Sequence, residues 1–145
     1  MAQIPFSLRE LTRAWRNLHV ASSQLPRGNA HRLLLIYAME CGLKAAWLKR
    51  EGRTLFGSTD IARTGHDLNE VLKSLHLGAK LHPVFHLCDV KDERRNAISR
   101  KNNRIDVLHQ AWRYGGELCA PPVDDAAMEA QLEAVHRLIE KELKS

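Results

Sequence analysis

The chain has 145 residues, of which 44% are hydrophobic and 27% are charged, and its formal net charge at pH 7 is +5. This length and composition predict one folded domain over residues 1–145 and exclude the disordered, collagenous and disulfide-scaffold classes of protein. The excess of bases precedes Glu117, because residues 117–145 contain seven acids and three bases. Polyanions are therefore candidate partners of the first part of the chain.

The cysteine count and the lengths of the apolar runs indicate in which compartment the protein is expected. Cys41, Cys88 and Cys119 are an odd number and form no C-x-x-C pair, so we expect neither a disulfide framework nor a zinc site. We expect a cytoplasmic protein, since the first residues reach charge at Arg9 without the apolar core of a signal peptide. The longest apolar run, residues 33–41, is shorter than the roughly 20 residues of a membrane span, so no membrane partner is expected.

Two helices are predicted in the first third of the chain. Ser7 and Glu10 have the spacing of a capping box, and apolar residues then recur every three or four positions, which predicts a helix over 7–19. Asn29 can cap a second helix that stops before Gly52. This second helix is apolar on most sides, so we expect it to lie at the centre of the fold.

The middle of the chain has weaker periodicity. Residues 52–65 are polar and contain glycine, which favours a loop. His66 and Asp67 then stand at the entrance of a short amphipathic helix that ends near Gly78. Its apolar positions are Leu68, Val71, Leu72 and Leu75.

Three further helices are predicted after this point. A short one runs over 83–88, and the basic stretch 91–104 leads into another that closes at Gly115. Its apolar seam has heptad spacing and consists of Ile98, Ile105, Leu108 and Trp112. A last helix has one apolar stripe, formed by Met128, Leu132, Val135, Ile139 and Leu143. The sequence therefore predicts an all-α fold, a compact antiparallel bundle of five to six helices.

Two groups of polar residues favour structural roles. Glu40 and Lys44 lie one helical turn apart in the apolar helix, which predicts a favourable pair. His82 and His86 have the spacing of a zinc pair with Cys88 nearby, but Pro83 interrupts it and no second ligand pair is visible. We predict no metal and no other cofactor.

The basic stretch 91–104 contains six bases and two acids. Its side chains form either a solvated helix face or a surface that binds phosphates. On a helix, Arg104 and His109 would flank the apolar seam on opposite sides, so a partner packed on the seam would meet both. The alternative is that both side chains extend from the seam into water.

The order of three features resembles the HEPN family (higher eukaryotes and prokaryotes nucleotide-binding). The features are residues 37–47 with Glu40 and Lys44, the Gly-His-Asp-Leu of residues 65–68, and the Arg-x4-His of residues 104–109. The resemblance covers roughly residues 30–115. It implies an antiparallel helical bundle that forms a homodimer and is often a metal-independent endoribonuclease of bacterial defence or toxin systems.

The same resemblance implies roles for individual residues. Arg104 and His109 match the family's nuclease motif, so His109 would transfer a proton and Arg104 would hold the phosphate. The cleaved RNA would keep a cyclic 2′,3′-phosphate end. The contacts to nucleic acid would come from basic side chains, namely Arg94, Arg95, Arg100, Lys101 and Arg113.

Two alternatives stay open beside the ribonuclease. The Trp112-Arg113-Tyr114 segment resembles the end of HEPN-like members that bind without cutting, which favours a non-catalytic interaction module for another protein. The other alternative is a plain nucleic-acid-binding or nucleotide-binding bundle.

Overall fold

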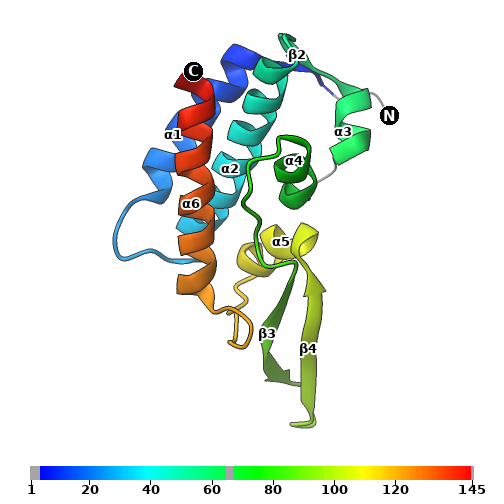
Figure 1. Cartoon of the computed structure of the whole chain (residues 1–145). Coiled ribbons are helices and arrows are strands. Elements are labelled where there is room, and N and C mark those ends of the chain that lie inside the picture. Colours follow the sequence, from blue (N-terminus) through cyan, green and yellow to red (C-terminus); the bar gives the residue numbers. More distant parts are fainter. Residues whose placement is uncertain (1–3, 65–66, 145) are drawn as a thin grey trace.

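Figure 1 shows the computed structural model, in which residues 4–64 and 67–144 are described. Helices pack around a long central helix, and a β-hairpin extends away from them. The helices are α1 (Leu8–Ser22), α2 (Asn29–Arg50), α3 (Ser58–Thr64), α4 (Leu68–Ser74), α5 (Leu108–Arg113) and α6 (Asp125–Lys144). The strands are β1 (Phe6–Ser7), β2 (Leu55–Phe56), β3 (Val84–Lys91) and β4 (Ala97–Arg104), and a 3₁₀ turn, η1 (Ile105–Val107), follows β4.

The predictions of helices at α1 and α2 are confirmed, but the N-cap of α2 is Gly28, and Asn29, the predicted cap, is the first residue of the helix. Ser7 and Glu10 form the capping box, with the backbone N of each residue 3.0 Å from the side-chain oxygen of the other. Helix α2 is central as expected, since it contacts α1, α4, α5 and α6. The contact is close at Gly42, where a Cβ atom would lie 2.6 Å from Trp15 and 2.9 Å from Ile139. A side chain there would push α1 and α6 away from α2.

The last helix also matches its prediction. Four residues of its stripe are buried against α2 and its neighbours, namely Met128, Leu132, Val135 and Ile139. At its start, Asp125 accepts hydrogen bonds from Trp112 Nε1 at 2.8 Å and from the backbone N of Leu118 at 3.2 Å. Asp125 therefore ties α5 and the segment after it to α6.

The stretch 52–65, predicted as a loop, contains β2 and α3. β2 pairs antiparallel with β1 in the register Phe6↔Phe56, which joins the start of α1 to the end of α2. The buried Asp60 accepts two hydrogen bonds from Arg53, at 2.8 and 2.6 Å, and one from Gly57 N at 2.9 Å. A buried, fully engaged carboxylate makes this segment an ordered connection.

Helix α4 forms where a short amphipathic helix is predicted. Asp67 is its N-cap and accepts from Asn69 N at 3.0 Å, while His66 lies outside the described residues. Gly78 follows the helix with φ +72°, a conformation that favours glycine.

The prediction of an all-α bundle is wrong. The predicted short helix over 83–88 and the basic stretch 91–104, predicted to lead into another helix, instead form an antiparallel hairpin of β3 and β4, with Val84 opposite Arg104 and Lys91 opposite Ala97. In Figure 1 this hairpin extends from the helical body. Most residues of β4 are exposed, so the strand needs no alternation of apolar and polar residues. The signal that identifies a half-buried strand is therefore absent from it.

The predicted apolar seam is divided between the hairpin and the core. Ile98 lies on β4 and is 44% exposed, whereas Ile105, Leu108 and Trp112 are buried inside the chain. The seven-residue spacing from Ile98 to Ile105 crosses the end of a strand, so it does not mark one helix face. The seam is core and not a surface on which a second copy could pack. Homodimerisation stays a prediction from the resemblance and would need another surface.

None of the helices in the described ranges combines the length and the hydropathy that a transmembrane span requires.

Candidate nucleic-acid interface

The hairpin tip is a three-residue loop, Glu93-Arg94-Arg95, closed by Asp92 and Asn96. Asp92 N donates to Asn96 O, and Arg95 N donates to Asp92 O, both at 3.0 Å. The Asp92 carboxylate also accepts from the backbone N of Arg94 and of Asn96, both at 2.9 Å. Arg95 has φ +64°, the left-handed conformation that three-residue hairpin loops use after their turn. The tip thus holds two adjacent arginines in an ordered loop.

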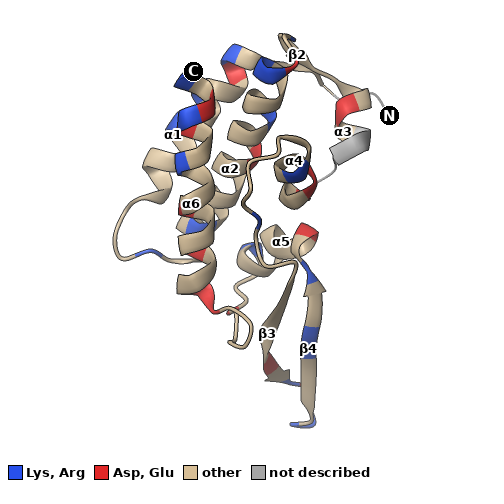
Figure 2. Ribbon diagram, in the orientation of Figure 1, with Lys and Arg blue, Asp and Glu red and all other residues tan. Residues whose placement is uncertain are grey.

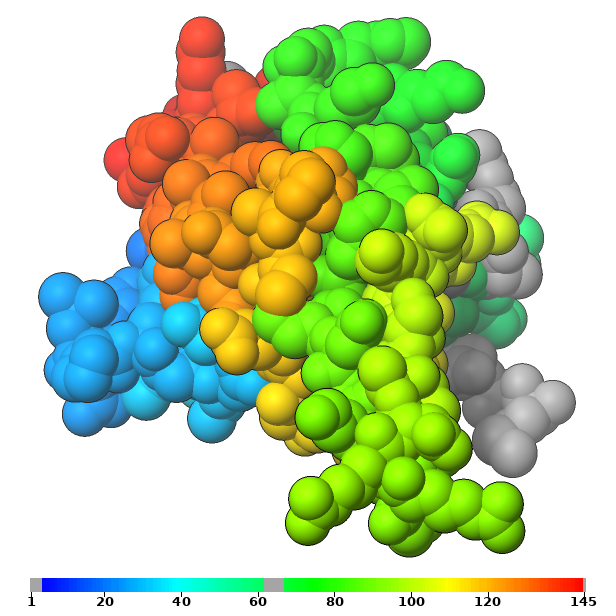
Figure 3. All heavy atoms as spheres, turned by 90° about the horizontal axis from the view of Figure 1, so that it is seen from below, coloured from blue at the N-terminus to red at the C-terminus, as the bar shows by residue number. Residues whose placement is uncertain are grey.

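Exposed cations extend along the hairpin from this tip. The segment 84–104 contains six bases and three acids, and one of those acids, Asp92, is engaged in closing the loop. Figure 2 shows the basic residues at the tip and along β4, and Figure 3 shows the hairpin atoms reaching beyond the rest of the molecule. The exposed basic side chains are Lys91, Arg94, Arg95, Lys101 and Arg104. We call these five residues the hairpin cations.

Arg100 has a different role from these neighbours. Its side chain is half-buried, and its Nε and Nη2 donate to the backbone oxygen of Cys88 at 2.9 and 2.6 Å. Two bonds from one planar guanidinium fix its orientation across the strand pair. Arg100 is therefore a positioned group, while Arg94, Arg95 and Lys101, predicted with it, are exposed.

A disulfide anchors the root of the hairpin. Cys88 of β3 is bonded to Cys119, and the segment after α5 pairs with β3 on both sides of this bond. Cys88 N donates to Glu117 O at 3.0 Å, and Cys119 N donates to His86 O at 2.9 Å. The odd cysteine count predicts no disulfide framework, but the fold brings together two cysteines 31 positions apart and joins them in one bond. Burial raises the pKa of the remaining thiol, Cys41, which is opposite to the shift of an activated thiolate.

The two predicted catalytic residues lie on different elements. Arg104 ends β4, is 78% exposed at its side chain and pairs with Asp106, Nη2 to Oδ2, at 3.6 Å. His109 is half-buried in the first turn of α5. The η1 turn separates them, so they do not flank one helical seam. The geometry from which their joint role is predicted is absent, and catalysis by these residues stays a prediction from the motif.

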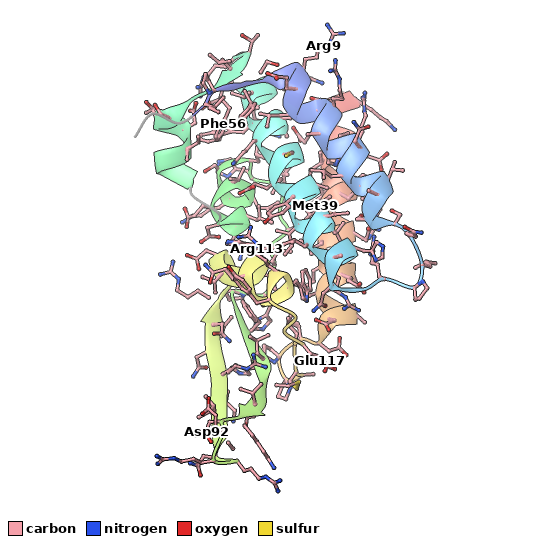
Figure 4. The ribbon with its side chains drawn as sticks, turned by 180° about the vertical axis from the view of Figure 1, so that it is seen from behind. Arg9, Met39, Phe56, Asp92, Arg113 and Glu117 are labelled. Carbon is pink, nitrogen blue, oxygen red and sulfur yellow. A yellow bond between two sulfur atoms is a disulfide. The ribbon has the colours of Figure 1, made fainter. Side chains whose placement is uncertain are left out.

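Arg113 lies at the end of α5 and not on the hairpin. Its Nη2 donates to the hydroxyl of Tyr37 on α2, and Figure 4 shows it beside the helical body. The hydroxyls of Tyr37 and then Tyr114 raise the pKa of Arg113, which keeps its charge. Arg113 thus connects the two tyrosines of the chain.

The polar residues for which the sequence predicts structural roles, Glu40 with Lys44 and His82 with His86, make contacts within the protein. Lys44 Nζ lies 3.7 Å from Glu40 Oε1, and both side chains are largely buried. His86 Nδ1 accepts from the backbone N of Asn102 at 2.8 Å, and His82 Nδ1 lies 2.9 Å from Val84 O. Within the described ranges, no three His, Cys, Asp or Glu side chains are arranged to hold a metal ion.

The hairpin, α5 and the segment after it line an open hollow of about 220 Å³ that the sequence does not reveal. Its lining combines apolar side chains with amides, a guanidinium and a tyrosine ring. The residues are Phe85, Leu87, Arg100, Asn103, Val107, Gln110, Ala111, Tyr114 and Gly116. We call this space the root hollow. The sequence could not predict the root hollow, because residues from β3, β4 and α5 meet only once the two strands of the hairpin pair.

A second set of exposed cations lies on α1. Arg9, Arg13 and Arg16 follow one stripe of this helix and line a shallow groove of about 390 Å³. Figure 4 shows Arg9 at one end of the molecule and Asp92, at the hairpin tip, at the other. The α1 stripe is therefore a basic surface separate from the hairpin, and only the basic stretch 91–104 is evident from the sequence.

Comparison with known proteins gives no relative. No family model matches the chain, and no curated protein and no solved structure is significantly similar to it. Nothing in these comparisons identifies a HEPN domain, so the resemblance stays a prediction from the sequence.

Proposed function

We propose that this protein binds nucleic acid through the β3–β4 hairpin. The observation that carries the proposal is the projection of the hairpin cations from the body on an ordered two-stranded ribbon. A β-ribbon can enter the major groove of a duplex or lie along a single strand, and Lys and Arg side chains neutralise phosphates. The disulfide and the strand pairing at its root fix the direction of the ribbon.

The salt dependence of binding tests the role of the hairpin. We expect that replacing Arg94, Arg95 and Lys101 together by Gln weakens binding of a labelled 12-nucleotide RNA. Each lost phosphate contact lowers the slope of log K against log salt by about 0.7 for a single strand, so three lost contacts lower it by about 2. Fluorescence anisotropy at several salt concentrations measures this slope.

The α1 stripe supplies a matched control. Replacing Arg9, Arg13 and Arg16 by Gln removes the same number of charges from exposed positions on α1, whose Arg9 lies at the other end of the molecule. We expect this variant to keep most of the affinity and nearly the full slope. Equal losses in the two variants would show that net charge alone attracts the RNA, and the hairpin proposal would be wrong.

RNA cleavage stays a second prediction, from the motif and not from the geometry. In EDTA, wild-type protein would release RNA fragments with cyclic phosphate ends, and His109→Ala would lower the rate about 10²- to 10⁴-fold as expected for a lost general base. Arg104→Lys would cleave more slowly than the wild type because an ammonium cannot make a bidentate phosphate contact. Binding without cleavage supports the hairpin proposal and contradicts the nuclease.

A protein partner and a cytoplasmic location also stay predictions from the sequence. The Cys88–Cys119 disulfide argues against the predicted cytoplasmic location, because disulfides persist mainly in oxidising compartments.

A further inference from the structure

We propose that the root hollow binds one unstacked base of a single-stranded nucleic acid, a proposal that rests on the phosphate-binding role of the hairpin. The hairpin cations would hold the backbone, and the hollow would take a base beside it. The ligand class is thus a single strand with at least one base free to leave its neighbours.

The hollow exists because β4 has a bulge. Phe85 pairs with Asn103 and Leu87 with Arg100, so β3 has one residue between the two pairs and β4 has two. The extra residue brings Arg100 and Asn103, three positions apart, to the same face as Phe85 and Leu87. The bulge is ordered, since Asn102 has φ +62° and its backbone N donates to His86.

This face supplies an apolar floor and a fixed charge. Phe85 and Leu87 line the hollow from β3, and Gly116 lines it from the segment after α5. A Cβ at Gly116 would lie 3.1 Å from Leu87 and 2.9 Å from the backbone oxygen of Ala111, so the absence of a side chain keeps the floor open. Arg100 reaches the same space with its guanidinium plane held by Cys88 O.

The rim supplies the groups that recognise a base. Tyr114 is 79% exposed, so its ring is available for a base to stack on. The Gln110 side chain is exposed and makes no hydrogen bond to another described residue, and an amide can both donate to and accept from a base edge. Asn103 Nδ2 donates to the backbone oxygens of Phe85 and Arg100, which orients its amide.

The size of the hollow fits a single ring system. Its volume of about 220 Å³ is below the roughly 300–1,000 Å³ of pockets for drug-sized ligands. Arg100, at the hollow, is five residues from Arg95, at the tip, which is roughly 16 Å of strand at about 3.3 Å per residue. A ligand that meets both therefore spans several nucleotides, so a 12-mer is a suitable probe.

The experiment compares a 12-nucleotide single strand with an abasic 12-mer that keeps the phosphates and lacks every base. We expect wild-type protein to bind the base-containing strand roughly 5- to 150-fold more tightly, the range measured for loss of one base stack. Tyr114→Ala should bring the two affinities together and leave the salt slope unchanged. Tyr114→Phe, the matched control, should keep the difference because the ring remains.

Each outcome decides the proposal. If the abasic strand binds as tightly as the normal one, or Tyr114→Ala keeps the difference, the root hollow takes no base, while salt-dependent binding still supports the hairpin. Tighter binding of a duplex of the same sequence would also overturn the base pocket. If no oligonucleotide binds, the hairpin proposal fails, and NMR titration with the four nucleoside monophosphates tests the hollow alone. Unchanged resonances of Gln110 and Tyr114 would then overturn it.

Discussion

Asp92 shows how one residue can oppose a surface's charge and still maintain the surface's shape. Its carboxylate carries a negative charge at the tip of a basic hairpin, which by itself weakens attraction to phosphate. The same carboxylate accepts two backbone hydrogen bonds that close the loop around Arg94 and Arg95. A side-chain hydrogen bond of this kind contributes about 1 kcal/mol, so the shape of the loop depends on Asp92.

The two roles of Asp92 can be separated by a pair of variants with the same charge. Asp92→Asn removes the charge and keeps an oxygen acceptor, so we expect tighter RNA binding than in the wild type. Asp92→Ala removes both, so the loop loses its side-chain hydrogen bonds and binding should be weaker than in Asp92→Asn. Fluorescence anisotropy measures both affinities. Equal affinities for the two variants would mean that the hydrogen bonds of Asp92 do not affect binding.

At the scale of elements, α1 and α6 are joined by a polar cluster. The rings of His19 and His136 are stacked with their centres 3.5 Å apart, and His136 Nδ1 accepts from Trp15 Nε1 at 3.1 Å. Glu133 lies against His19 at 3.0 Å and accepts from Arg27 at 2.8 Å. Because Nδ1 of His136 is an acceptor, the ring is neutral in this arrangement.

This cluster predicts a loss of stability in mild acid. Burial, and then the charge of His19, lower the pKa of His136, while Glu140 and Glu133 oppose the shift and Arg137 adds to it. A lowered histidine pKa means that the unfolded chain binds the proton more readily. The free energy of unfolding should therefore fall as the pH drops below the unfolded pKa of about 6.5.

His136→Gln and Glu133 together define the pH range over which the free energy of unfolding falls. His136→Gln can still accept from Trp15 and does not titrate, so its free energy of unfolding should change less than that of the wild type between pH 7 and pH 5. Burial raises the pKa of Glu133, but the hydrogen bonds and charges of Arg27 and His19 lower it by a larger amount, so the net pKa is lowered. The contribution of Glu133 to the free energy of unfolding is therefore lost only below about pH 4.5. Urea unfolding at each pH measures both effects. An equal decrease in wild type and variant would contradict the role of His136.

The elements also show which parts of the fold could be predicted from the sequence. Helices α1, α2, α4 and α6 each bury apolar residues at helical spacing, and three of them carry a side-chain cap, so their patterns reflect their packing. The hairpin buries little of β4, and its shape depends on the tip loop, two irregularities of register and pairing with a distant segment. The local signal for a hairpin in the sequence was the pair of turn-forming residues Asp92 and Asn96, which close the tip loop.

At the scale of the whole molecule, the sequence predicts the division of charge but not its arrangement in space. The basic stretch 91–104 is evident in the sequence, and the structure adds that it projects on a ribbon at the end of the molecule opposite Arg9. The root hollow could not be predicted, because its walls come from β3, β4 and α5 and meet through long-range pairing. The seam of Ile105, Leu108 and Trp112 is apolar as predicted, but it faces the protein's own core.

The Cys88–Cys119 bond also makes part of the chain a closed ring. The ring contains the hairpin tip, β4 and α5, because all of them lie between the two cysteines. Arg94 and Arg95 are exposed at the tip, so a trypsin-like protease can reach the peptide bonds after them. A single cut there opens the ring without releasing a fragment. The two pieces stay covalently joined until the disulfide is reduced.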